Sequence, residues 1–176
     1  RQRQMCIRDR LPSEKAAKVV SNMDSDDAVD ALDDLEEEDK AKIVGQLDKD
    51  SAEDVKMLLS YDEEEIGSCM TTNYICIPEN LTIRQAMSEL VKQAGENDNI
   101  MTIYVVDEKG VFAGAIDLKD LIRARENAHL EDLVLKSYPY VTDHEKIDDC
   151  MDRILDYAED SIPVLSEDKK ILGVIT

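Results

Sequence analysis

The sequence is poor in aromatic and histidine side chains. It has no tryptophan, one phenylalanine and two histidines among its 176 residues. So few rings leave no stacking platform for nucleic-acid bases. His129 and His144 have no matching ligands nearby in the sequence, so both are expected to be surface residues rather than metal or acid–base groups. No stretch approaches the roughly 18 apolar residues of a membrane span, and no signal peptide is recognisable.

Basic residues are also scarce. The chain has 21 lysines and arginines against 41 acidic residues, a formal charge of −20. This balance argues against binding nucleic acid or an anionic membrane surface, because both require a basic face. It suits divalent cations, although an acidic surface can also serve solubility alone.

Enzyme motifs are missing as well. The sequence has no Gly-rich phosphate loop, no GxSxG, no HExxH and no plausible nucleophile–base pair. Its four cysteines show no CxxC pairing, so they are expected to be reduced thiols of a cytoplasmic protein rather than zinc ligands. We therefore expect a protein that is not an enzyme.

The first sixty residues divide into two parts. Residues 1–10 are basic and carry no helical stripe, so we interpret them as a leader outside the fold. Residues 11–60 have an apolar period of twelve, marked by Leu11, Met23, Leu35, Leu47 and Leu59. Capping or acidic residues open each unit, among them Ser13, Ser25 and Ser51. The pattern predicts helices of about two turns stacked into a superhelical repeat domain, which makes an interaction surface.

Residues 61–69 form an acidic joint. Four consecutive acids, residues 62–65, precede Gly67. The run is typical of a solvated linker, and the alternative is an acidic hinge that faces the next domain.

The rest of the chain contains one pattern twice. Residues 102–106 predict a strand, residues 107–110 a tight turn, residues 111–116 the return strand, and Asp117 the cap of a following helix. Residues 161–176 repeat the hairpin, with Val164 and Gly173 in the places of Val105 and Gly114. Upstream, helices are predicted over residues 86–91 and 150–157. Two such units share a core, because one is too small to cover its own sheet.

This tandem pair resembles a CBS-domain pair. The first unit covers residues 70–126 and the second residues 127–176, the latter stopping after its last strand. The predicted fold is therefore α+β, an α-helical superhelical repeat domain followed by two β-α-β-β-α units. The resemblance implies that Asp120 contacts the ribose of an adenine nucleotide such as ATP. Asp117 departs from the family pattern, which has a hydroxyl residue there, and its charge would repel a phosphate. Asp120 could equally be a first-turn acid that the helix dipole favours.

The order of helical repeats, acidic joint and CBS pair resembles the cytosolic region of MgtE-type magnesium transporters. The segment DEEEIGSCMT of residues 62–71 carries most of this resemblance. In that family Mg²⁺ lies between the helical domain and the CBS pair, locks a compact homodimer and closes the pore of a membrane domain that follows. The resemblance implies Mg²⁺ ligands at Asp26, Asp30, Glu65 and Asp148. Other family acids fall on Lys146 and Ala158, so some sites are lost or rebuilt from neighbouring acids.

The sequence thus favours a cytosolic Mg²⁺ sensor of a magnesium channel, on the cytoplasmic face of the membrane, acting as a homodimer through its CBS pairs. The absent membrane domain would be its partner, and nucleic acid would not. A nucleotide-binding regulatory module and a pure protein-interaction module stay open as alternatives.

Overall fold

The N-terminal part of the fold is a stack of short helices. The computed structural model describes residues 12–176 except 127 and 158, so the predicted leader and Leu11 lie outside the described residues. The helices are α2 (Ser13–Val20), α3 (Ser25–Asp33), α4 (Glu37–Val44) and α5 (Lys49–Leu58). Their first residues are twelve apart, which confirms the predicted period and the length of about two turns.

The helices pack on alternate neighbours. α2 packs on α4 and α3 on α5, as expected for a superhelical repeat. The periodic residues Met23, Leu35, Leu47 and Leu59 all pack against the core. The predicted serine caps were wrong, because Ser13 and Ser25 are the first helical residues rather than the caps that precede them.

The first β-containing unit follows the 3-10 helix η1 (Ile66–Cys69). Its elements are β1 (Ile75–Pro78), α6 (Ile83–Gln93), β2 (Thr102–Val106), β3 (Phe112–Asp117) and α7 (Leu118–Arg123). β1 runs parallel and β3 antiparallel to the central β2. Gly110 takes a φ of 77° in the hairpin turn, and Asp117 accepts a hydrogen bond from the amide of Lys119, as predicted.

The second unit repeats this arrangement after η2 (Leu130–Leu133), with β4 (Val141–Thr142), α8 (Ile147–Asp156), β5 (Ile162–Leu165) and β6 (Ile171–Ile175). Val164 pairs with Gly173 as Val105 pairs with Gly114, and a register shift follows each pair. The internal repeat is thereby confirmed down to the strand register.

Two helices begin three residues earlier than the sequence predicted. α6 begins at Ile83 because Thr82 and Gln85 form a capping box at its first turn. α8 begins at Ile147, three residues before the prediction. The return strand β3 is displaced by one residue, to Phe112–Asp117. The errors are confined to element ends, where apolar periodicity carries little information.

Three apolar clusters hold these parts together. One lies within the first unit, between its sheet and α6. A second joins the two sheets through Tyr104, Ala115, Tyr138 and Val174, and the Tyr104 hydroxyl lies 2.6 Å from the Ser161 hydroxyl. This is the predicted shared core. The third was not foreseen: it runs from Leu32 in the helical domain through Ile66 and Met70 to Val164 in the second unit.

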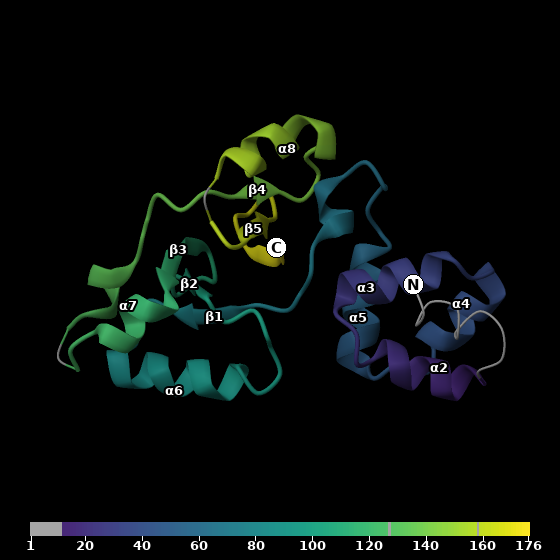
Figure 1. The fold of residues 1–176 in the computed structure, drawn as a ribbon, viewed down its shortest axis with the longest axis horizontal. Helices are drawn as coiled ribbons and strands as arrows, with labels where there is room; N and C mark the ends of the chain where they lie inside the picture. The colour runs from purple at the N-terminus through teal and green to yellow at the C-terminus, as the bar shows by residue number, and fades with distance from the viewer. Residues whose placement is uncertain (1–11, 127, 158) are drawn as a thin grey trace.

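The path of the chain explains the third cluster. Figure 1 shows the helical domain at one side of the molecule and the two sheet units beside each other, with α8 over the second. η1 contacts both α5 and β4, although the whole first unit separates it from β4 in the sequence. The apolar contacts of the helical domain are therefore mainly with the second unit.

Candidate functional site

The acidic joint is an ordered segment that pairs with the approach to α8. The amide of Ile66 donates to the carbonyl of Glu145 at 2.9 Å, and the amide of Ile147 donates to the carbonyl of Glu64 at 2.9 Å. The pairing places the joint acids directly beside the first turn of α8. The joint thus faces the second unit, since a solvated linker would not form backbone pairs, and its role as a hinge stays a prediction.

Glu65 is held at the centre of this pairing. One carboxylate oxygen accepts from the amide of Asp62 at 3.0 Å, and the other lies 2.8 Å from His144 Nδ1. The Asp62 amide and then His144 lower the pKa of Glu65. The hydrogen bond to Glu65 and the charge of Asp143 raise the pKa of His144. His144 is exposed as predicted, and its contact with Glu65 joins residues that lie far apart in the sequence.

Asp26 and Asp30 lie one turn apart on α3, as the sequence predicted. Partial burial and the surrounding acids, Asp26 first among them, raise the pKa of Asp30. Oδ1 of Asp26 is buried and has no hydrogen-bond partner within the described residues. A buried carboxylate oxygen without a partner is costly, so this atom is suited to accept a donor or a cation.

Asp30 faces the joint across a pocket of about 400 Å³. The pocket is also lined by Asp33 and Lys40, which form an ion pair, and by Glu63 of the joint. Acids of α3 and of the joint thus share one hollow, with a single described lysine beside them.

Asp148 lies in a second pocket, of about 280 Å³, at the first turn of α8. Glu63, Glu64 and Lys146 line it too, and Lys146 Nζ lies 3.2 Å from Glu64. Glu63 therefore lines the hollows of both Asp30 and Asp148. The sequence placed Glu63 in the acidic run but gave no reason to single it out, because its position depends on pairing with residues some 80 positions later.

The four predicted metal ligands do not converge on one point. In the part of the chain that the structure describes, no three His, Cys, Asp or Glu side chains form a group that could hold a metal ion. Their donor set still fits Mg²⁺, which prefers oxygen and keeps several waters, so one or two carboxylates per ion suffice. Asp26, Asp30, Glu65 and Asp148 thus stay predictions.

Asp120 is exposed on the first turn of α7, directly after β3. One carboxylate oxygen of Asp117 caps that helix and accepts a hydrogen bond of 2.7 Å from the amide of Lys119. Both carboxylates lie at the N-terminus of α7. A phosphate there would be repelled by their negative charge, although the helix dipole would attract it.

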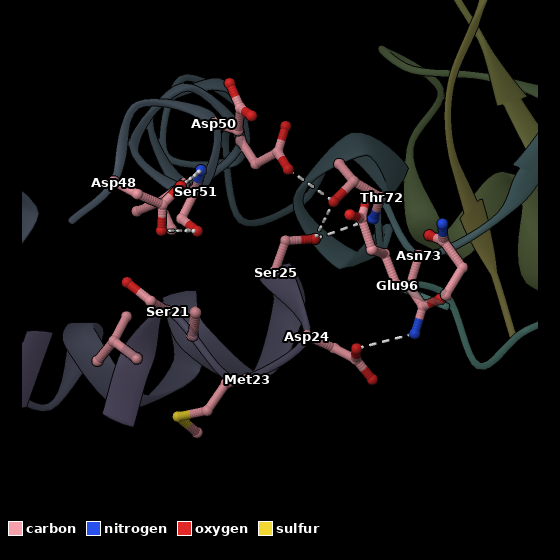
Figure 2. Close-up of a pocket in the computed structure, with 15 residues that line it drawn as sticks. Ser21, Met23, Asp24, Ser25, Asp48, Asp50, Ser51, Thr72, Asn73 and Glu96 are labelled. Atoms are coloured by element: carbon pink, nitrogen blue, oxygen red, sulfur yellow. Dashed lines mark hydrogen bonds between the residues drawn. The ribbon is translucent and has the colours of Figure 1, made fainter. Parts of the chain in front are cut away.

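A pocket that the sequence did not predict lies between the helical domain and the first sheet unit. It measures about 460 Å³, and its acidic lining residues are Asp24, Asp48, Asp50, Asp54 and Glu96 (Figure 2). Burial and then neighbouring acids raise the pKa of Asp54, while a hydrogen bond from Thr72 lowers it. The acids come from three separate segments, so no local pattern could reveal the pocket.

The sequence matches two families. Residues 2–64 match the MgtE intracellular N domain, and residues 64–127 and 130–176 match the CBS domain. The magnesium transporter MgtE of Thermus thermophilus is 32% identical over 126 residues, which are 70% of this chain and 27% of that protein. This chain therefore spans about a quarter of that relative.

Two solved structures extend the comparison. The soluble part of a magnesium transporter has a TM-score of 0.88 at 33% sequence identity. The match covers 94% of this chain and 65% of the chain in that structure. The cytosolic domain of the Mg²⁺ channel MgtE in complex with ATP has a TM-score of 0.72 at 26% identity, with 94% and 78% covered.

The fold and the matches define a CBS-pair protein with a helical domain in front. The chain belongs to the MgtE family, as a homologue of the N domain and CBS pair of the magnesium transporter MgtE. Among the described residues, no helix has the length and apolar character needed to cross a membrane.

Proposed function

We propose that this chain is the cytosolic Mg²⁺-sensing and gating region of a magnesium channel or transporter and acts without enzymatic activity. The observation that carries the proposal is the position of Glu63. This one acid lines a pocket with Asp30 of the helical domain and another with Asp148 of the second CBS unit.

The physical basis is repulsion between like charges. At neutral pH the carboxylates of α3, the joint and α8 repel one another and favour separation of the helical domain from the CBS pair. Bound Mg²⁺ supplies positive charge that offsets this repulsion. Because ligands that bind only the compact state stabilise it, several weak sites give a steep response to concentration. The membrane domain of the same protein would be the partner that this response gates.

Glu65 has a different part in this scheme. Both of its oxygens already accept hydrogen bonds, from Asp62 and His144. To bind Mg²⁺, Glu65 would have to release one of them. Asp26 has the opposite character, because its buried Oδ1 has no partner among the described residues.

We also propose that the chain is a homodimer through its CBS pairs. Apolar side chains are exposed on helices of both units: Val91 on α6 is 69% exposed, Ile122 on α7 62%, and Leu155 on α8 73%. Val91 and Leu155 lie on the corresponding helices of the two units, and exposed apolar side chains at such repeated places support a contact with a second copy.

Mg²⁺ is expected to make the 176-residue chain more compact. In small-angle X-ray scattering, the radius of gyration should fall as MgCl₂ is added and stay constant in KCl at matched ionic strength, because screening alone does not bridge carboxylates. Forward scattering in the same titration gives the mass and tests the dimer. Asp30→Asn with Glu63→Gln should weaken the response, since it removes one charge from each side of the Asp30 pocket.

A matched control is Glu108→Gln with Asp168→Asn, which removes two exposed charges from the hairpin turns. This control should respond like the wild type. Equal compaction by both salts would leave the acids with a solubility role and overturn the proposal. Wild-type compaction of the Asp30/Glu63 variant would overturn the site.

The second candidate function is nucleotide binding. It is favoured by the position of Asp120 after β3 and by the likeness to a cytosolic domain that binds ATP. Isothermal titration calorimetry should then detect ATP, and Asp120→Asn should weaken binding about tenfold or more, because hydrogen bonds to a charged group are the stronger kind. Asp168→Asn is the charge-matched control. Equal ATP affinity of the two variants would show that Asp120 makes no contact with the nucleotide. If the chain neither binds ATP nor becomes more compact with Mg²⁺, the remaining function is that of a protein-interaction module.

A further inference from the structure

The segment of residues 70–74, which we call the connector, is bonded to the helical domain on one side. The amide of Thr72 donates to Ser25 Oγ at 2.9 Å, and the Thr72 hydroxyl donates to Asp54 Oδ2 at 2.9 Å. Ser25 is buried, with 8% of its surface exposed. Figure 2 shows Thr72 facing Ser25 across the edge of the acidic pocket. These bonds attach the connector to the first turn of α3 and to α5.

Asn73 continues the connection into the first CBS unit. Its Nδ2 donates to Asp24 Oδ1 at 2.9 Å, and its Oδ1 accepts from the amide of Asp98 at 2.9 Å. One side-chain amide therefore bridges the turn before α3, as Figure 2 shows, and the loop between α6 and β2. A residue that donates to one domain and accepts from another is a direct physical link between them.

The other side of the connector is bonded to β6. Thr71 and Val174 exchange both backbone hydrogen bonds, each at 2.9 Å. Met70 is fully buried against Gly173, where an added Cβ would lie 2.8 Å from the carbonyl oxygen of Thr71 and 2.9 Å from Met70 Cγ. The connector is thus in close backbone contact with the last strand of the second unit.

We propose that the connector is a mechanical coupler, in which Thr72 and Asn73 transmit docking of the helical domain to β6 and to the α6–β2 loop. When the helical domain moves away, Thr72 and Asn73 lose their partners on α3 and α5. The freed connector then holds Thr71 less firmly, and the bridge to Val174 opens more often. The coupler needs no metal, so it goes beyond the proposed function and can be tested separately from it.

Native-state amide hydrogen exchange of the whole chain, without Mg²⁺, tests the coupler. Thr72→Val keeps the shape of the side chain and removes its hydroxyl, and Asp54→Ala removes the acceptor. Both variants should speed exchange at Thr71 and Val174 about fivefold to tenfold, the effect of one net hydrogen bond on a local opening equilibrium. Asp50→Ala removes the same charge from the same pocket, but no described hydrogen bond joins Asp50 to the connector, so exchange should stay at the wild-type rate.

The amide of Ile103, in the centre of the first unit, reports on global stability and should not change in any variant. If Asp54→Ala lowers overall stability and changes Ile103 as well, Asn73→Ala provides the test, with Asn97→Ala as its control, because Asn97 bonds only within the first unit among the described contacts. Faster exchange confined to the helical domain, with Val174 unchanged, would overturn the coupler. Equal effects of Asp54→Ala and Asp50→Ala would also overturn it, since charge rather than the connector would then be responsible.

Discussion

Gly114→Ala is expected to lower the free energy of unfolding by about 3 kcal/mol or more, because it combines backbone strain with a steric clash. Gly114 has a φ of 148°, a region that only glycine populates readily. A Cβ there would lie 2.5 Å from the carbonyl oxygen of Leu135. Because that oxygen belongs to the backbone, paired through the Ala115–Leu135 bridge, it cannot move aside without breaking the bridge.

Gly110→Ala is the matched control for this prediction. Gly110 also has a positive φ, of 77°, but nothing lies within 4 Å of an added Cβ. Its cost should be the backbone strain alone, about 1–2 kcal/mol. Urea unfolding followed by far-ultraviolet circular dichroism gives both values. Equal losses in the two variants would show that the close approach of Leu135 is not what fixes glycine at position 114.

Leu32→Ala is expected to destabilise the protein by about 2–5 kcal/mol, because it leaves a cavity in a fully buried site. The distribution of the loss is the sharper prediction. Leu32 belongs to the cluster that runs from the helical domain into the second CBS unit. Amide exchange should therefore accelerate in α3 and in β5 together, while β2 of the first unit, which has its own cluster, changes less.

Leu90→Ala provides the converse experiment. Leu90 packs in the cluster of the first unit, and its loss should loosen β1 and β2 before it affects the helical domain. If Leu32→Ala loosens the helical domain alone, then the continuous cluster is a contact surface between two independent folding units rather than one core.

The repetitive parts of the fold were predictable from the sequence. A twelve-residue period places helix starts accurately because each helix must present the same apolar face to the same neighbours. The pairs Val105–Gly114 and Val164–Gly173 could be matched because hairpin register is set locally, by turn length and alternation. The choice of capping residue was wrong. Asp24 and Asp48 are the caps of α3 and α5, and because serine and aspartate cap helices about equally well, residue type alone could not distinguish them from the serines nearby.

The candidate site was less predictable, for a physical reason. Asp26 and Asp30 share a helix face, and this follows from helical spacing alone. The contact of His144 with Glu65 joins positions 79 apart, and the bonds of Thr72 to Ser25 join positions 47 apart. Such contacts depend on how separately folded segments dock, so residue type and spacing could suggest the acids of the joint but not their partners.

The packing of η1 against the second unit has a consequence for how the chain folds during synthesis. The helical domain is synthesised well before β4–β6, which cover Ile66 and Met70. For the time needed to translate some hundred residues, this apolar surface has no native partner, and only closure of a long loop removes it from water. This apolar surface is therefore open to non-native association until β6 is made, and we expect the carboxylates in the first turns of α3 and α4 to help keep that intermediate soluble.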